Sequence, residues 1–324
     1  MGRKGGKTDG SSIRVLIDSD PGIDDVVTLA LAARAPELEI VGVTTTYGNA
    51  TLDLTTRNAK EILRLAGRSD IPVYPGSDRP LQRPLVTAPE THGPSGVGYA
   101  PVPPPPPPPP PDGQTTNPTV LLDLLSRSEE PVVLVTLGPL TNLAHALTAD
   151  PALVRSRVRR HIGMFGTLEA RGNTNRWADF NAWCDPEAAQ VVLRSELPSE
   201  MVGLDVTRQM VLSAAVVERL ARSADTVVSW LAQALRFYVE FHRQRELLDG
   251  CVVNDVLTVG ELLAPGLLKL AHRRLLVDLD EGDHRGHTKS ARDGARARVA
   301  LGVDIPRMCA VLTRVLGESW TDPH

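Results

Sequence analysis

The sequence has few cysteines and no long apolar run. Its 324 residues include only Cys184, Cys251 and Cys309, which are far apart, odd in number and without a CxxC pair. This pattern argues against a disulfide framework and a zinc site, and it fits a reducing cytoplasm. No apolar segment is long enough to cross a bilayer, and the polar, Gly-rich N-terminus lacks the apolar core of a signal peptide. We therefore expect a cytoplasmic protein with no membrane partner.

An excess of charge of one sign is also missing. The formal net charge is -4, the isoelectric point is near 6.1, and no long basic block occurs. These properties do not indicate a nucleic-acid partner, so a small-molecule substrate is expected. The 42% of hydrophobic residues is enough for a large buried core.

Apolar strands alternate with helices in the first half of the chain. Strands are expected at residues 13–18, 38–46, 71–74 and 132–137, with helices at 24–34, 52–65 and 140–147. The second half is expected to hold helices at 214–221, 227–246 and 306–316 and strands in LLVDLD and ARVALGVD. The alternation predicts an α/β fold: a mostly parallel central sheet, Rossmann-like, with helices on both faces. Ligands bind such sheets beyond the C-terminal ends of the strands.

A proline tract interrupts this pattern without dividing it. Residues 103–111 are all proline, which cannot enter a sheet or helix interior and should form a stiff polyproline II segment on the surface. The alternation continues beyond it. We therefore predict a disordered tail at 1–11 and a single domain at 12–324 with a proline-rich loop at 101–113. A loop insertion is the simpler interpretation, and a docking site for an SH3-type domain is the alternative.

Four carboxylates, Asp18, Asp20, Asp24 and Asp25, lie within eight residues at the end of the first expected strand. They could belong to a turn and a helix N-terminus that bind nothing. A cap or a helix dipole contributes only about 1 kcal/mol, which poorly offsets such crowding. Carboxylate and carbonyl oxygens are ligands for Ca²⁺ or Mg²⁺, so we favour a site for a hard divalent cation.

Motifs along nearly the whole chain resemble one family. The segment DSDPGIDD at 18–25 is followed by TTTYGN at 44–49, THGPSG at 91–96, LGPLTNLA at 137–144, RGNTNRWADFNAWCDPEAA at 171–189, MVGLDVT at 201–207 and VNDVLTV at 253–259. Together they resemble the nucleoside hydrolases, Ca²⁺-dependent N-ribohydrolases that split ribonucleosides into ribose and base. The resemblance implies their α/β fold, their activity, and a homodimer or homotetramer.

The resemblance also implies roles for the matching residues. The Ca²⁺ shell would comprise Asp20, Asp25, the carbonyl of Leu137 and Asp255, and Asp20 would also be the general base. Asp24 would hold the ribose 2' hydroxyl, Asn181 and Asp255 would bind the 2' and 3' hydroxyls, and Asn173 would reach the 5' hydroxyl. Asn49 would lie beside the metal and the substrate, His92 would lie near the base, and Tyr238 would contact the substrate. Asp18 would be a supporting acid rather than a ligand.

Two residues depart from the family pattern. Asn254 stands where much of the family has the histidine often assigned to protonating the leaving base, and an amide cannot act as an acid. His242 is a candidate substitute, although a surface or packing histidine is an equally reasonable interpretation. Asp179 stands where the family usually has a glutamate on the 5' hydroxyl; its shorter side chain puts that contact in doubt or leaves room for a larger group. We expect an altered substrate, and we expect Trp177 and Trp183 to pack in the core rather than line the pocket.

The expected function is metal-dependent hydrolysis of the N-glycosidic bond of a ribonucleoside. One alternative is a calcium-dependent nucleoside- or sugar-binding protein that has lost turnover. The other is a phosphatase similar to the haloacid dehalogenases, with Asp18 as nucleophile and Asp20 as acid. Against the latter, Gly22 stands where that family has Thr or Val, and no downstream lysine has a convincing context.

Overall fold

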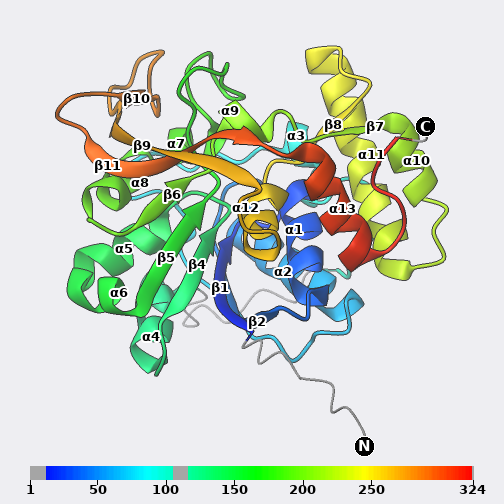
Figure 1. Cartoon of the computed structure of the whole chain (residues 1–324), viewed down its shortest axis with the longest axis horizontal. Helices are drawn as coiled ribbons and strands as arrows, with labels where there is room; N and C mark the ends of the chain where they lie inside the picture. Colours follow the sequence, from blue (N-terminus) through cyan, green and yellow to red (C-terminus); the bar gives the residue numbers. More distant parts are fainter. Residues whose placement is uncertain (1–11, 105–115, 323–324) are drawn as a thin grey trace, which may run out of the picture.

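The computed structural model describes residues 12–104 and 116–322 and has a nine-stranded sheet at its centre (Figure 1). The tail at 1–11 and the prolines from residue 105 onward lie outside the described residues, so the predictions for them stay untested. Within the described ranges, no helix is both long and apolar enough to cross a membrane.

The strand order in the sheet is β10-β9-β11-β6-β5-β4-β1-β2-β3. Their bounds are β1 Ile13–Ser19, β2 Leu38–Thr45, β3 Val73–Pro75, β4 Val132–Thr136, β5 Val158–Gly163, β6 Ser199–Met201, β9 Leu268–Val277, β10 Thr288–Ser290 and β11 Ala295–Val303. Pairing is parallel from β3 to β11, whereas β9 is antiparallel to both β11 and β10. This arrangement confirms the predicted mostly parallel sheet.

Helices cover both faces of the sheet. One face carries α1 Ile23–Arg34, α2 Leu52–Leu65, α11 Thr226–Glu246, α12 Val256–Leu263 and α13 Ile305–Leu316, and the other carries α4 Val120–Arg127, α5 Thr141–Ala149, α6 Pro151–Arg157 and α8 Pro186–Arg194. Successive side chains of β1 point to opposite faces of the sheet, and both faces are buried: Val15 and Ile17 pack in one hydrophobic core, while Leu16 packs in the other. A near-continuous apolar strand is therefore required at this position.

Shorter elements surround the C-terminal edge of the parallel strands (Figure 1). They are α3 Pro89–His92, α7 Phe180–Cys184, α9 Leu204–Thr207 and α10 Ala214–Leu220, with a separate two-stranded sheet of β7 Val211–Ser213 and β8 Gly250–Val252. At this edge β1 pairs with β4 so that Asp18 lies opposite Thr136. The residues that follow these two strands are thereby brought together, as the sequence predicted for the acidic segment and Leu137.

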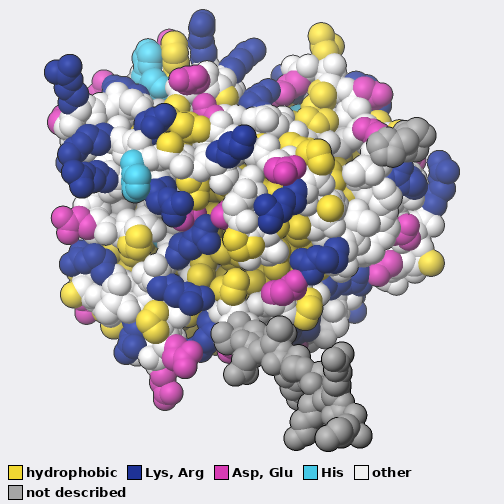
Figure 2. Space-filling view, in the orientation of Figure 1, with side chains coloured by type: hydrophobic (Ala, Val, Ile, Leu, Met, Phe, Trp, Pro, Cys, Tyr) yellow, Lys and Arg dark blue, Asp and Glu magenta, His cyan; other side chains and the backbone are white. Residues whose placement is uncertain are grey.

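Charged side chains mark the antiparallel end of the sheet. Arginines at 273, 274, 296 and 298 are exposed on β9 and β11, and basic side chains are frequent on the left side of the face in Figure 2. The outermost strand, β10, carries the exposed Lys289. Charges on edge strands disfavour edge-to-edge pairing with other chains.

Candidate active site

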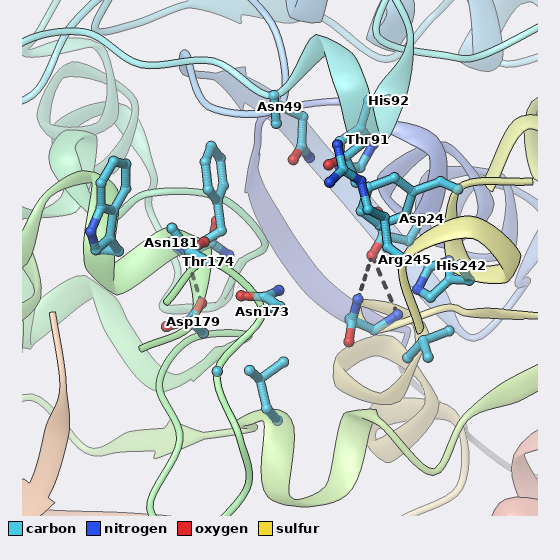
Figure 3. Close-up of a pocket in the computed structure, with 18 of the residues that line it drawn as sticks. Asp24, Asn49, Thr91, His92, Asn173, Thr174, Asp179, Asn181, His242 and Arg245 are labelled. Carbon is cyan, nitrogen blue, oxygen red and sulfur yellow. Dashed lines mark hydrogen bonds between the residues drawn. The ribbon is translucent and has the colours of Figure 1, made fainter. Parts of the chain in front are cut away.

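A pocket of about 910 Å³ opens at the C-terminal edge of the parallel strands (Figure 3). The predicted site residues that line it are Asp24, Asn49, His92, Leu137, Asn173, Asp179, Asn181, Tyr238, His242, Asn254 and Asp255. Asp20 and Asp25 are 0% exposed, and both are hydrogen-bonded to Asn49 of the pocket wall. The structure thus brings together residues that the sequence spreads over more than 230 positions.

Three carboxylates form a compact group beside the pocket. Asp24, Asp25 and Asp255 each place an oxygen within 4.8 Å of the others, and all three are buried. The Ser19 hydroxyl and the Gly22 amide donate to Asp25 at 2.7 and 3.0 Å. A group with this spacing, made of carboxylate oxygens only, suits a hard divalent cation.

The Asp20 carboxylate lies in a narrow slot between two glycines, whose lack of a side chain leaves room for it. One of its oxygens, Oδ2, accepts the Asn49 amide at 2.7 Å, whereas Oδ1 is buried and has no hydrogen-bond partner within the part of the chain that the structure describes. A Cβ atom added at Gly138 would lie 2.5 Å from Oδ1, and one added at Gly48 would lie 2.0 Å from Oδ2. The two glycines allow the carboxylate this position, and the unpaired oxygen is an open ligand or a proton acceptor.

The electrostatics of the cluster favour a bound cation. Burial raises the pKa of Asp20 and Asp255 well above the ordinary range, and the charges of neighbouring carboxylates, Asp25 and Asp24, raise both further. Burial also raises the pKa of Asp24 and Asp25. Several carboxylates that hinder one another's ionisation are relieved by a divalent ion, so the donor set fits a metal.

Asp18 is hydrogen-bonded to side chains outside the carboxylate trio. Its Oδ1 accepts the Thr44 hydroxyl at 2.5 Å and the Asn142 amide at 2.8 Å, and burial raises its pKa to about 6. Asp18 does not line the pocket. This position does not suit a nucleophile, and the supporting role stays a prediction.

One end of the pocket is formed by α7 and the residue that caps it. Asn181 donates from Nδ2 to the Leu137 carbonyl at 2.6 Å and to the Met164 carbonyl at 2.9 Å. The Asp179 carboxylate caps α7: it accepts the backbone amides of Gly166, Asn181 and Ala182. Asp179 is 0% exposed, and burial raises its pKa to about 6. Its oxygens are committed to the backbone, which increases the doubt about a contact with the 5' hydroxyl.

Two imidazoles and a tyrosine form the other end. His92 Nδ1 accepts the Ile23 amide at 3.0 Å, so neutral His92 carries its proton on Nε2, and burial lowers its pKa to about 4. His242 Nδ1 lies 2.8 Å from the Tyr238 carbonyl, which can only accept, so Nδ1 carries the proton. Neutral His242 therefore has a lone pair on Nε2. The Tyr238 ring lies 5.4 Å from the His92 ring and 4.5 Å from the His242 ring, measured between centroids.

Asn254 is engaged on both sides of its amide. Its Nδ2 donates to Asp24 at 3.0 Å, and its Oδ1 accepts the Thr207 hydroxyl at 2.9 Å. These bonds orient Asp24 and indicate a positioning role for Asn254, which stands at the position where much of the family has a catalytic histidine.

Comparison with known proteins identifies the family. The family model described as "Inosine-uridine preferring nucleoside hydrolase" matches residues 15–310. The chain belongs to the nucleoside hydrolase family. A pyrimidine-specific ribonucleoside hydrolase RihA of Enterobacter is 36% identical, covering 91% of this chain and 94% of its own. A relative of 40% identity in Schizosaccharomyces pombe, which carries no functional name, covers 79% of this chain and 81% of its own.

Solved nucleoside hydrolases share the fold. A plant enzyme superposes with a TM-score of 0.85 at 30% identity, over 95% of this chain and 99% of its own. A purine-preferring ribonucleoside hydrolase from Gardnerella vaginalis gives 0.84 at 30% identity, over 94% and 98%. This nucleoside hydrolase is therefore an enzyme acting on N-glycosyl bonds, in a family that depends on a metal. The phosphatase alternative and the binding protein without turnover are set aside with this result.

The expectation that Trp177 and Trp183 pack in the core of this nucleoside hydrolase is wrong. Trp183 is half-buried and lines the pocket. Trp177 is also half-buried: it stacks on His284 at 4.8 Å between ring centroids and lines a neighbouring hollow. Trp177 does not pack in the core because the segment that carries it runs over the surface, and Trp183 does not because it faces the pocket.

The sequence analysis missed several residues of the pocket wall. Arg171, Thr174, Arg176, Arg208 and Arg245 line the nucleoside hydrolase pocket, and none was assigned a role from the sequence. The only available signal was the pair of arginines that flank Asn173 in RGNTNR.

Proposed function

We propose that this nucleoside hydrolase is a Ca²⁺-dependent N-ribohydrolase in which Asp20 is the general base. The observation that carries the proposal is the buried Oδ1 of Asp20, which has no hydrogen-bond partner among the described residues, on a carboxylate close enough to Asp25 and Asp24 of the trio for their charges to raise its pKa. Asp20, Asp25, the Leu137 carbonyl and Asp255 would hold the ion. When bound, Ca²⁺ supplies an acidified water and fixes the ribose diol.

The carboxylates would carry the chemistry at the anomeric carbon. Asp20 Oδ1 accepts the proton of the attacking water, since Oδ2 is already occupied by the Asn49 amide. Cleavage of the C1'–N bond builds positive charge on the ribose ring, and the nearby carboxylates stabilise it.

Side chains around the trio would orient the ribose. Asp24, held by Asn254, and Asn181, held against Leu137 and Met164, would bind the 2' and 3' hydroxyls together with Asp255. Asn173 would reach the 5' hydroxyl.

Departure of the base would be assisted by His242. Because Nδ1 already donates to the Tyr238 carbonyl, protonated His242 offers its second N–H, on Nε2, to the leaving base. Burial lowers the pKa of His242, so a minority of molecules carry this proton at neutral pH. His92, whose neutral form keeps its N–H on Nε2, would donate a hydrogen bond to the same base.

The identity of the base is not specified by the relatives. The named relatives include a pyrimidine-specific and a purine-preferring enzyme. The deciding experiment is base release from inosine, adenosine, guanosine, uridine, cytidine and p-nitrophenyl riboside, with EDTA treatment and Ca²⁺ restoration. Metal-dependent release supports the proposal. Calcium-dependent binding of all six without any release would overturn it. A homodimer or homotetramer, a cytoplasmic location and the single domain at 12–324 belong to the same proposal.

A further inference from the structure

The pocket wall at the ribose end carries two arginine side chains. Arg171 and Arg176 line the active-site pocket and also a second hollow of about 570 Å³ beside it. Within residues 12–104 and 116–322 neither guanidinium forms an ion pair, whereas Arg208 of the same pocket is paired with Glu246 at 2.6 Å. Among the described residues, Glu169 is the one acid lining the second hollow, whereas the active-site pocket also contains acids, Asp24 and Asp255 among them. The two guanidinium groups thus lie where the pocket meets a hollow that is lined by a single acid.

The loop that carries these arginines is held in place by hydrogen bonds. The Asp205 carboxylate accepts the backbone amides of residues 168, 169 and 170 at 2.8 to 3.0 Å, which fixes the chain just before Arg171. The Gly172 amide then donates to the Arg176 carbonyl at 3.0 Å. This bond closes a turn, and the two arginines lie at its two ends. A Cβ at Gly172 would lie 2.3 Å from the Ala178 carbonyl oxygen, so the turn requires glycine.

An aromatic wall limits where the second arginine can go. The Arg176 guanidinium lies 5.1 Å from the centre of the Trp177 ring, and Trp177 stacks on His284. A guanidinium held over an aromatic ring keeps its N–H donors at its edge, where an anion can bind them.

The acid expected at this end makes its hydrogen bonds to the backbone. Asp179 is fully buried and caps α7 with both oxygens, while Asn173 and Asn181 beside it are neutral (Figure 3). A carboxylate facing the 5' oxygen would repel an anion there. Because the Asp179 oxygens are bonded to backbone amides and the two guanidinium groups have no ion pair among the described residues, the local preference changes from a hydroxyl to a negative group.

We propose that the substrate carries a phosphate on its 5' oxygen and that Arg171 and Arg176 bind this phosphate. The inference rests on the proposed function for the orientation of the ribose. In the reaction the C1'–N bond breaks, the hydroxyl of water joins C1', and the remaining proton ends on the base. The products are free base and ribose 5-phosphate.

Binding tests the phosphate site without turnover. Isothermal titration of the calcium-loaded enzyme with ribose 5-phosphate and with ribose measures the contribution of the phosphate alone. We expect ribose 5-phosphate to bind at least about tenfold more tightly, and the difference to shrink at high salt. Equal affinities would overturn the inference whatever the catalytic results.

Turnover separates this inference from the proposed function. Base release is compared between uridine and uridine 5'-monophosphate and between inosine and inosine 5'-monophosphate. We expect the ratio of kcat/KM, monophosphate to nucleoside, to fall about tenfold in Arg171→Ala and in Arg176→Ala. Arg245→Ala is the matched control, because it removes the same charge from the pocket near His242 (Figure 3) and should keep the ratio within about twofold.

The failures differ in kind. Release from nucleosides but not from monophosphates refutes the phosphate inference and leaves the proposed function standing. Tight, arginine-dependent binding of ribose 5-phosphate with no release from any substrate supports the phosphate site and refutes the proposed function.

Discussion

The slot around Asp20 makes Gly138 a sensitive test of the proposed general base. In Gly138→Ala the new Cβ would lie 2.5 Å from Asp20 Oδ1 and 2.7 Å from Cγ. Ordinary contact begins at 3.4 Å, so the carboxylate must move by about 0.9 Å, the difference between the two separations. Its other oxygen is bonded to the Asn49 amide, which opposes that movement.

A displacement near 1 Å costs a reacting group about 100-fold in rate, or roughly 2.7 kcal/mol on the barrier. We therefore expect kcat to fall about 100-fold on p-nitrophenyl riboside with Ca²⁺ present. Calorimetric titration of Ca²⁺ shows whether the ion site moves as well. Gly282→Ala is the control, because its Cβ meets nothing within 4 Å. A folded Gly138→Ala enzyme with a kcat within twofold of wild type would refute the assignment of Asp20.

Three further predictions follow from individual side chains. Asp20→Ala should abolish turnover, by at least about 1,000-fold in kcat, while circular dichroism stays native; normal kcat would contradict its role. His242→Ala should lower kcat for inosine more than for p-nitrophenyl riboside, whose leaving group needs no proton; equal losses would remove His242 as the acid. Burial lowers the pKa of His161 from 6.5 to about 3, so protonation favours the unfolded chain: its effect on stability is absent above pH 6.5 and grows as pH falls towards 3. Between pH 7 and 5 the wild type should lose about 2 kcal/mol of unfolding free energy that His161→Gln does not lose, measured by urea denaturation, and parallel losses would contradict this account.

The fold could be predicted because its signals are local. Helix α2 was predicted at its observed bounds, and α1, α11 and α13 within a residue or two, since apolar periodicity and acidic starts are properties of the segment itself. The antiparallel end was less accessible. Strand β10 lies within a charged stretch that gave no strand pattern, and it forms because its neighbour β9 provides the pairing edge.

The membership of the site could be predicted, but its internal bonds could not. Motif resemblance named the acids and the amides that meet at the pocket. The use of Asp179 as a helix cap and the fixed proton on His242 Nδ1 depend on which backbone group happens to face each side chain. Such distances are set by tertiary packing and leave no trace in residue spacing.

The acids of the pocket come from segments far apart in the chain, so a bound ion would be coupled to the stability of the whole molecule. Asp25 lies in the first turn of α1, whereas Asp255 immediately precedes α12, and the Asn254–Asp24 bond joins segments 230 residues apart. Unfolding would have to separate these two segments and release any bound ion. At a free Ca²⁺ concentration about 100 times its dissociation constant, the folded state gains roughly 2.7 kcal/mol by mass action. Calcium supply would then set the lifetime of the enzyme as well as its rate.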